Sequence, residues 1–359
     1  MAMLVIAIIL GMIMGFAAHR ASICTVRAVA EVMSARSAHM FASLGRSWLW
    51  IWAVTIPFLW LVPGAAAVDG WALTGLALLG GLAFGLGAAI NGACAYSTMS
   101  RLMDGEGAML VAVMGFAAGA GIFAVLIDAQ WLMRPAQVPA LLAVITPWAP
   151  LLAIAFGAWA LYEAIRLWRT RDRTVGFHGL LLARRYRLST GAMLMGLSGA
   201  ILFLMYGPFG YTATFDLLIE RALGSNIKPV PVPRWLLLLA VLAGMLVSTL
   251  HRGSFRLDLQ PRRVWVLNFT GGMLMGFGTA LAPGGNDALI MYGVPTLSPY
   301  ALPTYLALAI GVAAGILLLR AAIGFRAKAE FRDDLFVADS WTRPIPPNPL
   351  EATPAASRG

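Results

Sequence analysis

Long apolar runs alternate with short polar breaks along most of the chain. About nine of the runs are long enough to cross a hydrocarbon core of about 30 Å as helices. They begin near Met3, Ser47, Trp71, Met109, Pro147, Thr190, Arg234, Val264 and Pro303. Because helices satisfy their own backbone groups within a bilayer, the pattern predicts an all-α polytopic membrane protein with about nine transmembrane helices.

Apolar pieces that glycine or proline breaks, and that are too short to cross a membrane, lie between these runs. They comprise residues 22–34, 95–103, 209–223 and 287–292. Such pieces predict short re-entrant helices that enter the membrane domain and return.

Four segments share one pattern: a small residue, three further residues, a glycine, and a marked position nine residues later. The glycines and their marked positions are Gly15 with Cys24, Gly85 with Cys94, Gly196 with Met205, and Gly276 with Gly285. One small-x3-small motif means little, because membrane helices commonly pack through such motifs. Four copies at a constant offset favour an internal duplication over chance enrichment in glycine. The copies divide between two predicted pseudo-symmetric halves, residues 1–165 and 188–325, and transporters built this way place the substrate path at the repeat interface.

Arginine dominates the segment between the halves. Residues 166–187 carry seven arginines and one acid, Asp172. The positive-inside rule places this loop in the cytoplasm, and basic residues at 251–263 and 320–328 place that loop and the C-terminus on the same side. The remaining residues, 326–359, are polar and rich in proline, so we expect a disordered cytoplasmic tail.

Composition excludes a soluble globular protein. Of the 359 residues, 60% are hydrophobic and 12% charged, whereas about 25% of residues are charged in soluble domains. The net charge of +10 does not indicate a nucleic-acid partner, because the arginines are divided between short loops rather than gathered on one face. The first apolar run has no basic residue before Arg20 and no good cleavage site, so it is interpreted as a retained helix.

Cys24 and Cys94 are the only cysteines, and both occupy a marked position of the repeat. A glycine-containing break followed by a new half-helix exposes backbone N–H groups and the positive end of a helix dipole, which favours an anion. A thiol at that point lies in a field that stabilises the thiolate, and it offers a soft S–H donor. Buried cysteine is often only a small hydrophobe, but the shared offset favours a chemical role for both residues.

Residues 282–289 form another polar turn within the apolar sequence. The turn is interpreted either as a capped break in a membrane helix or as a constriction that lines a substrate path. In the second reading Gly285 and Asn286 face the substrate, and Asp287 holds an arginine or the backbone. Asn91, which precedes Cys94 by three residues, belongs to the same candidate path.

The remaining charged candidates lie near predicted helix ends. His19 and Arg20 either end the first span at the interface or attract an incoming anion. Four further residues are expected to form structural salt links: Arg27, Glu31, Arg101 and Asp104. The chain has no Walker-type loop, dinucleotide motif or Ser-His-Asp spacing, and its histidines are scattered, so no enzyme activity, cofactor or metal site is expected.

Over about residues 3–325 the chain resembles the YeeE/YedE family of bacterial sulfur-compound transporters, whose characterised members take up thiosulfate. The resemblance rests on three features: the glycine pair before Cys24, the string Asn91-Gly-Ala-Cys94, and Ala-Pro-Gly-Gly-Asn-Asp-Ala-Leu at 282–289 with Tyr-Gly-Val-Pro at 292–295 after it. It implies an inner-membrane protein in which cysteines pass thiosulfate along through S–H contacts. Cys24 and Cys94 match two pathway cysteines, while the third, toward the C-terminal half, has no counterpart in this chain.

The primary hypothesis is therefore import of a small sulfur anion, thiosulfate first and sulfite second. The expected partners are that anion, the lipid bilayer, and a cytoplasmic sulfur-transfer protein or regulator. One alternative is a membrane enzyme that moves sulfane sulfur through Cys24 and Cys94. Another is a sensor that signals through residues 166–187 or the tail, as the resemblance to family members encoded with sulfur-oxidation systems implies.

Overall fold

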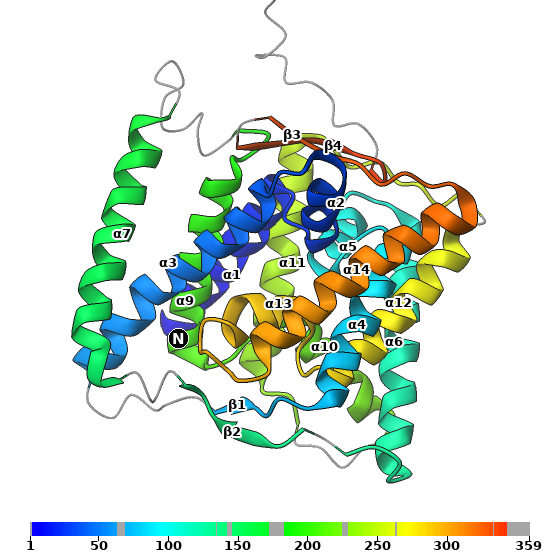
Figure 1. Cartoon of the computed structure of the whole chain (residues 1–359), viewed down its shortest axis with the longest axis horizontal. Helices are drawn as coiled ribbons and strands as arrows, with labels where there is room; N and C mark the ends of the chain where they lie inside the picture. Colours follow the sequence, from blue (N-terminus) through cyan, green and yellow to red (C-terminus); the bar gives the residue numbers. More distant parts are fainter. Residues whose placement is uncertain are drawn as a thin grey trace, which may run out of the picture.

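Helices form almost all of the computed structural model, which describes residues 2–62, 69–133, 135–141, 146–171, 183–224, 229–262, 264–332 and 334–342 (Figure 1). The first half contains α1 (Ala2–Ala21), α2 (Thr25–Ala35), α3 (His39–Leu61), α4 (Gly75–Asn91), α5 (Ala95–Met103), α6 (Gly107–Asp128), the 3-10 turn η2 (Thr146–Trp148) and α7 (Ala149–Arg169). The second contains α9 (Leu188–Tyr206), α10 (Tyr211–Ala222), α11 (Val232–Arg252), α12 (Val264–Leu281), α13 (Gly285–Ala288), the π-helical turn η3 (Leu289–Gly293) and α14 (Ala301–Ile323).

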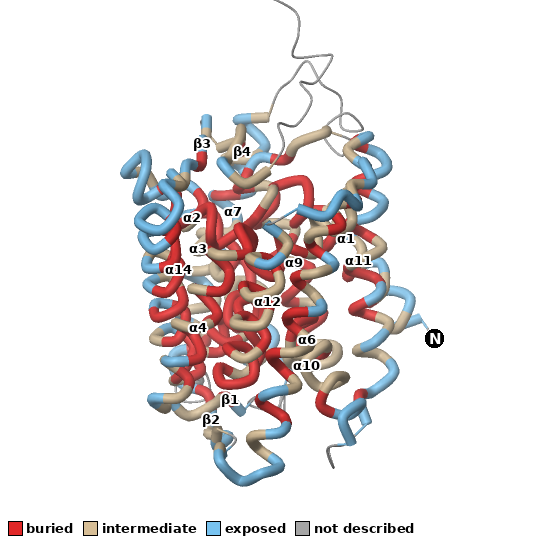
Figure 2. The backbone as a smooth tube through the Cα atoms, turned by 90° about the vertical axis from the view of Figure 1, so that its right-hand side faces the viewer, coloured by how far each residue is buried: buried red, intermediate tan, exposed pale blue. Residues whose placement is uncertain are grey.

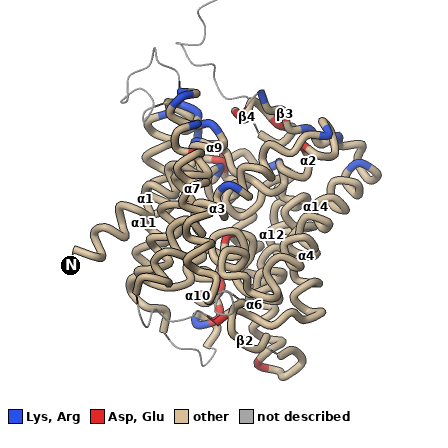
Figure 3. Tube along the Cα trace, turned by 60° about the vertical axis from the view of Figure 1, so that its left-hand side comes forward, with Lys and Arg blue, Asp and Glu red and all other residues tan. Residues whose placement is uncertain are grey.

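Two small two-stranded antiparallel sheets lie at opposite ends of the helical domain in Figure 1. Strand β1 (Asp69–Trp71) pairs with β2 (Gln137–Pro139), and β3 (Ala329–Arg332) pairs with β4 (Leu335–Asp339). Lysine and arginine gather at the β3–β4 end, as Figure 3 shows. We call that end the arginine-rich face and the β1–β2 end the opposite face.

Eight segments of the described chain are long and apolar enough to cross a membrane, which confirms an all-α polytopic membrane protein. The ninth predicted run is α3, whose 23 residues also have the length of a span. This helix contains Arg46 and four tryptophans, Trp48, Trp50, Trp52 and Trp60. It begins at His39, well before the predicted Ser47, and its polar first turns are tolerated because Arg46 faces Glu163 and Asp334 at 3.7 Å each.

Four long helices end in a break that leads into a short helix, and the pairs are α1/α2, α4/α5, α9/α10 and α12/α13. The predicted short pieces coincide with these short helices to within a few residues. The first two breaks lie toward the arginine-rich face, where Gly92 contacts Trp341 after β4. The last two lie toward the opposite face, where Gly210 and Gly284 line a cavity together with Trp71 of β1. The interior between these layers is buried (Figure 2).

The repeat glycines explain how the long helices pack. Helix α1 packs on α11, α9 on α3, α4 on α14 and α12 on α6, so the pairings are reciprocal between the halves. The glycine of each motif faces the partner helix backbone at Val241, Ser47, Leu308 and Phe116 respectively. A Cβ atom on any of these glycines would overlap that backbone, so only glycine permits the contact.

The third copy of the motif differs from the predicted register. Met205 lies inside α9, which continues to Tyr206, and the residue that precedes the short helix is Gly210. In the fourth copy this position is Gly284, one residue before the predicted Gly285. The spacing between packing glycine and break is therefore constant only in the first half.

The prediction that the tail is disordered from residue 326 onward is wrong for residues 329–342. Their apolar positions alternate as in a strand, and Ala329 and Phe336 are buried against the membrane domain. Arg27 of α2 donates from Nε to Asp339 at 2.5 Å, and its guanidinium lies 4.4 Å from the Phe336 ring centre. The two short strands were not predicted, because the proline-rich residues that follow them made the whole segment resemble a disordered tail. Residues 343–359, and residues 172–182 of the arginine-rich loop, lie outside the described residues.

We expect the attachment of the β3–β4 hairpin to weaken in acid. Burial raises the pKa of the Asp339 carboxyl, but the charge and hydrogen bond of Arg27 outweigh that effect and hold the pKa below its usual range. A carboxyl with a lowered pKa stabilises the folded state above its unfolded pKa of about 3.9, and this stabilisation is lost as the pH falls through the lowered value. Asp339→Asn should detach the hairpin already at pH 7, at a cost of about 3–5 kcal/mol.

The measurement is alkylation of a cysteine introduced at the buried Ala329, in a chain with Cys24 and Cys94 replaced by alanine. Glu330→Gln on the exposed side of the same strand is the matched control. Equal labelling rates in Asp339→Asn and Glu330→Gln would show that the ion pair does not hold the hairpin.

Candidate functional site

The short helices of the two halves meet at the centre of the membrane domain (Figure 1). At the start of α2, the Thr25 hydroxyl accepts a hydrogen bond from Asn286 Nδ2 of α13 at 3.2 Å. At the start of α5, the Tyr96 ring lies 5.1 Å from that of Tyr211, the first residue of α10. The N-terminal turns of α2, α5, α10 and α13 therefore converge on one point, which we call the central junction.

The two breaks of the first half have the same backbone structure. Ser22 and Gly92 adopt the left-handed conformation, with φ of 53° and 73°. At each break one N–H bonds back three residues and the next bonds back five, as in a Schellman motif. Two residues later the chain is extended at Cys24 and Cys94, which precede α2 and α5 directly.

Both cysteines are buried free thiols at the central junction, with exposed fractions of 1% and 0%. Their thiols lie against each other, although 70 residues of sequence separate them. Neither thiol makes a full capping hydrogen bond, although the backbone N–H groups of Arg27 and Ser97, in the first turns of α2 and α5, face the sulfur atoms of Cys24 and Cys94. The structure therefore brings the two predicted cysteines together at the starts of two short helices.

None of the residues that directly precede the four short helices caps its helix with a side chain, but the Asp287 carboxylate accepts from the Thr212 N–H in the first turn of α10. N-terminal turns have backbone N–H groups without an intrahelical partner, and the helix dipole adds a partial positive charge at the same end. The starts of α2 and α5, where no carboxylate of the described residues accepts from a backbone N–H of the first turn, therefore favour an anion.

The second half of the chain contributes residues 284–287 to the central junction. Gly284 and Gly285 have φ of 99° and 64°, a conformation that side chains disfavour. A Cβ atom at Gly285 would also lie 2.9 Å from the hydroxyls of Thr212 and Thr279. Asn286 is fully buried.

Asp287 joins this turn to the start of α10. Its carboxylate accepts hydrogen bonds from both the backbone N–H and the hydroxyl of Thr212. Of the two partners predicted for Asp287, an arginine or the backbone, the structure shows the backbone, together with a hydroxyl.

Several polar atoms around the central junction have no hydrogen-bond partner in the described chain. They are Tyr96 Oη, Tyr211 Oη, Thr279 Oγ1 and Asn286 Oδ1. Buried polar atoms are nearly always satisfied, so unsatisfied ones gathered at one place indicate a position for water or ligand. Sequence reasoning missed Tyr211 and Thr212, because the third copy of the repeat has its break five residues after the predicted position.

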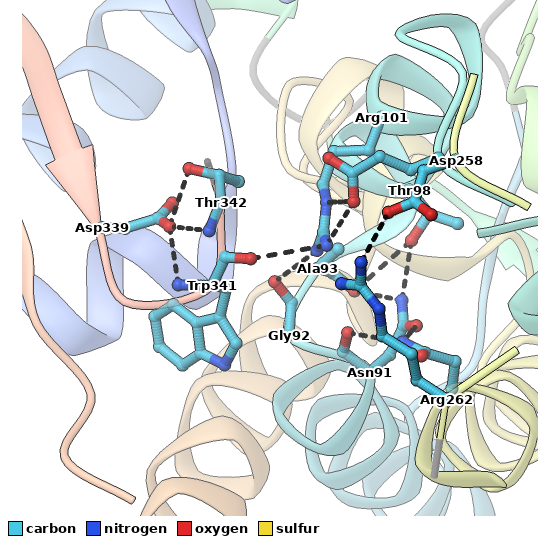
Figure 4. A network of polar contacts seen from close by, with 12 residues as sticks. Asn91, Gly92, Ala93, Thr98, Arg101, Asp258, Arg262, Asp339, Trp341 and Thr342 are labelled. Atoms are coloured by element: carbon cyan, nitrogen blue, oxygen red, sulfur yellow. Dashed lines mark hydrogen bonds and ion pairs between the residues drawn. The ribbon is translucent and has the colours of Figure 1, made fainter. Parts of the chain in front are cut away.

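Asn91 has partners at both ends of its amide. Its Nδ2 donates to the Ala93 carbonyl and to Thr98 Oγ1, and its Oδ1 accepts from Asn268 of α12 at 2.9 Å. Figure 4 shows this network together with Arg101, which reaches the carbonyls of Gly92 and Trp341. Asn91 thus stabilises the break that presents Cys94, and its assignment to the path stays a prediction.

His19 and Arg20 lie inside the protein rather than at a membrane interface, with exposed fractions of 2% and 1%. His19 bonds to Ser248 and Asp104, and Arg20 bonds to Ser248 and His251. These contacts join α1 to α11 on the arginine-rich side of the central junction. Their role in attracting an anion stays a prediction.

The four residues expected to form structural salt links each face an oppositely charged or titratable partner. Arg27 pairs with Asp339, Glu31 with His39, Arg101 with Glu106, and Asp104 with His19. These partners lie in the hairpin, at the start of α3, in the turn before α6 and in α1 respectively.

Two cavities approach the central junction from opposite sides. The arginine cavity, of about 100 Å³, reaches Ser22, Ile23 and Ser97, which flank the two cysteines. The opposite cavity, of about 270 Å³, reaches Gly210 and Gly284. Among the described residues, no three His, Cys, Asp or Glu side chains are grouped so that they could hold a metal ion.

Comparison with known proteins gives one result that covers most of the chain. The family model for sulphur transport matches residues 20–314, a range that contains all four breaks and both cysteines. A comparison with curated proteins found no match. The chain therefore belongs to the sulphur transport family, the YeeE/YedE family that its sequence resembles, and is a multi-pass membrane protein of a family that transports sulfur compounds.

Proposed function

We propose that this protein imports thiosulfate, or a closely related sulfur anion, across the bacterial inner membrane through the central junction. One observation carries the proposal: two free thiols lie at the starts of α2 and α5, at a buried point between two cavities where four short helices begin. The arginine-rich face, with residues 166–187 and the C-terminal hairpin, is the cytoplasmic side in this proposal.

The chemistry of the junction suits an ion with two kinds of terminal atom. Thiosulfate carries oxygen atoms and one terminal sulfur. Backbone N–H groups at helix starts bind the oxygens, while the S–H groups of Cys24 and Cys94 face the soft sulfur. Because nothing at the junction forms a strong covalent or metal bond to the ion, it can both enter and leave.

The two halves, residues 1–165 and 188–325, contribute different chemistry to this path. The first supplies both thiols, and the second supplies Gly285, Asn286 and the turn that Asp287 holds. A third cysteine is absent from the second half, and the backbone at Gly285 with the Asn286 amide takes its place. N–H donors recognise the oxygens of sulfite, sulfate and thiosulfate alike, so this part of the path is the less selective one.

One further function has an observation in its favour. Because the Cys24 and Cys94 thiols lie against each other, a membrane enzyme that moves sulfane sulfur between them is the second candidate. Mass spectrometry distinguishes the two, since an enzyme would carry a persulfide or disulfide during turnover and a transporter would keep both thiols reduced.

Replacing either cysteine by alanine should reduce uptake of labelled thiosulfate by about tenfold or more, because each substitution removes a donor at the narrowest point. Insertion into the membrane should be unchanged, because a small buried side chain is lost. Thr55→Ala, which removes a buried hydroxyl on α3 far from the junction, is the matched control. Uptake is measured in cells that lack other thiosulfate importers, and near-normal uptake by both cysteine variants would refute the path.

The turn at 284–287 should contribute to binding of the oxygens. Asn286→Ala should weaken thiosulfate binding by about 1–3 kcal/mol, because a buried polar partner is lost. Gly285→Ala should obstruct the junction, whereas Gly157→Ala, at an open position on α7, should have no effect. The measurement is thiosulfate affinity with competition by sulfite and sulfate. If affinity and competition are unchanged in both variants, the turn is only a capped helix break.

The proposed orientation is tested at Ser340, an exposed residue after β4. A cysteine introduced there, in a chain lacking Cys24 and Cys94, should resist a membrane-impermeant reagent in intact cells and react in inverted vesicles. Rapid labelling in intact cells would place the arginine-rich face outside.

A further inference from the structure

The arginine cavity contains more positive than negative side chains. Helices α1, α2, α5 and α11 and the C-terminal segment contribute to its walls. Its charged and titratable lining residues are His19, Arg27, Arg101, Asp104, Glu106, Arg252 and Arg256. Three hydroxyl groups complete the polar lining on the side of the cysteines and α5: Ser22, Ser97 and Ser100.

Most of these charges already have a partner. Arg101 donates to Glu106 at 2.7 and 3.0 Å, and Asp104 accepts from His19 at 3.1 Å. Arg27 is paired with Asp339 of the hairpin. Arg256 is exposed, so water can solvate it.

Arg252 differs from these residues, because the Asp104 carboxylate attracts its charge but forms no ion pair with it. It ends α11 with an exposed fraction of only 7%, and its Nε has no hydrogen-bond partner. A buried guanidinium with an unsatisfied donor is costly unless an anion or ordered water completes it. Its planar set of N–H donors matches the oxygens of a tetrahedral oxyanion better than a point charge would.

We propose that the arginine cavity is a second anion site, separate from the central junction, in which Arg252 binds a small sulfur oxyanion such as sulfate, sulfite or thiosulfate. Arg252 provides a buried charge with an unsatisfied Nε donor, and Ser97 and Ser100 provide hydroxyl groups. The volume of about 100 Å³ holds one small ion with a few waters. Phe336 and Thr342 of the C-terminal segment also line the cavity, so that segment is part of the wall around the bound ion.

The site deepens the proposed function by giving the ion a position between the cysteines and the arginine-rich face. Its existence is nevertheless testable without transport. Sulfate is the probe, because it carries only oxygen terminal atoms and does not need the soft donors of Cys24 and Cys94.

The first experiment measures binding of labelled sulfate to the purified full-length protein. Arg252→Gln should weaken binding by roughly tenfold to a hundredfold, as expected for the loss of a charge-assisted contact. Arg320→Gln, on the exposed last turn of α14 and outside the cavity, is the matched control and should bind as the unaltered protein does. Equal sulfate affinity in the Arg252→Gln and Arg320→Gln variants would overturn the proposal.

A second measurement keeps Arg252 in place, in case its replacement destabilises the fold. With Cys24 and Cys94 replaced by alanine, a cysteine introduced at Ser100 should be alkylated several-fold more slowly when sulfate is present. A cysteine introduced at Ala38, exposed at the start of α3, should show no protection. Sulfate protection in this cysteine-free background separates the site from the central junction. Near-normal thiosulfate uptake by the Cys24→Ala and Cys94→Ala variants would refute the proposed function alone, and absence of sulfate protection would refute this second site alone.

Discussion

Contact between helix backbones at the four repeat glycines holds this membrane domain together. Within a bilayer, helices gain little from burying apolar side chains, so close van der Waals packing carries much of the association. At Gly15, Gly85, Gly196 and Gly276 the partner backbone occupies the space of a missing Cβ. Each contact holds a long helix against its partner helix at a point several residues before the break. The breaks, and the cysteines that follow two of them, consequently have defined positions rather than the freedom of surface loops.

The breaks can be tolerated because their backbone groups are satisfied locally or face the junction. Schellman bonds after α1 and α4 return two N–H groups to the helix that has just ended. Asn91 and Asp287 then tie neighbouring segments across the interior. Among the buried side-chain atoms of the described residues that remain unsatisfied, Tyr96 Oη, Tyr211 Oη, Thr279 Oγ1 and Asn286 Oδ1 lie around the central junction. Part of the polar cost of the domain is thereby placed where the short helices begin.

Much of this arrangement could be predicted from the sequence, because it follows from local composition. The apolar runs, the short pieces between them, and the shared offset of Cys24 and Cys94 predict the helices and the breaks of the first half. The position of the third break could not be predicted. The residues around Met205 are compatible with a continued helix, and α9 does continue to Tyr206. The partners of Arg27 and Asp104 also escaped prediction, because they depend on which distant segments fold together. The β3–β4 strands were obscured by the proline-rich residues after them.

The opposite cavity and the arginine cavity differ in electrostatic sign as well as in shape. The former includes Asp69, Asp216 and Glu220 beside Arg234, whereas arginines predominate in the latter. Because the pairing of helices is reciprocal, this difference comes from side chains and not from the scaffold. An internal field of this kind cannot set the direction of net flow, which depends on the gradient of the ion. In the proposed path the field would instead set where an anion dwells, because acidic side chains repel it at one end and arginines attract it at the other. A soluble acceptor on the basic side would then meet a site that is already occupied.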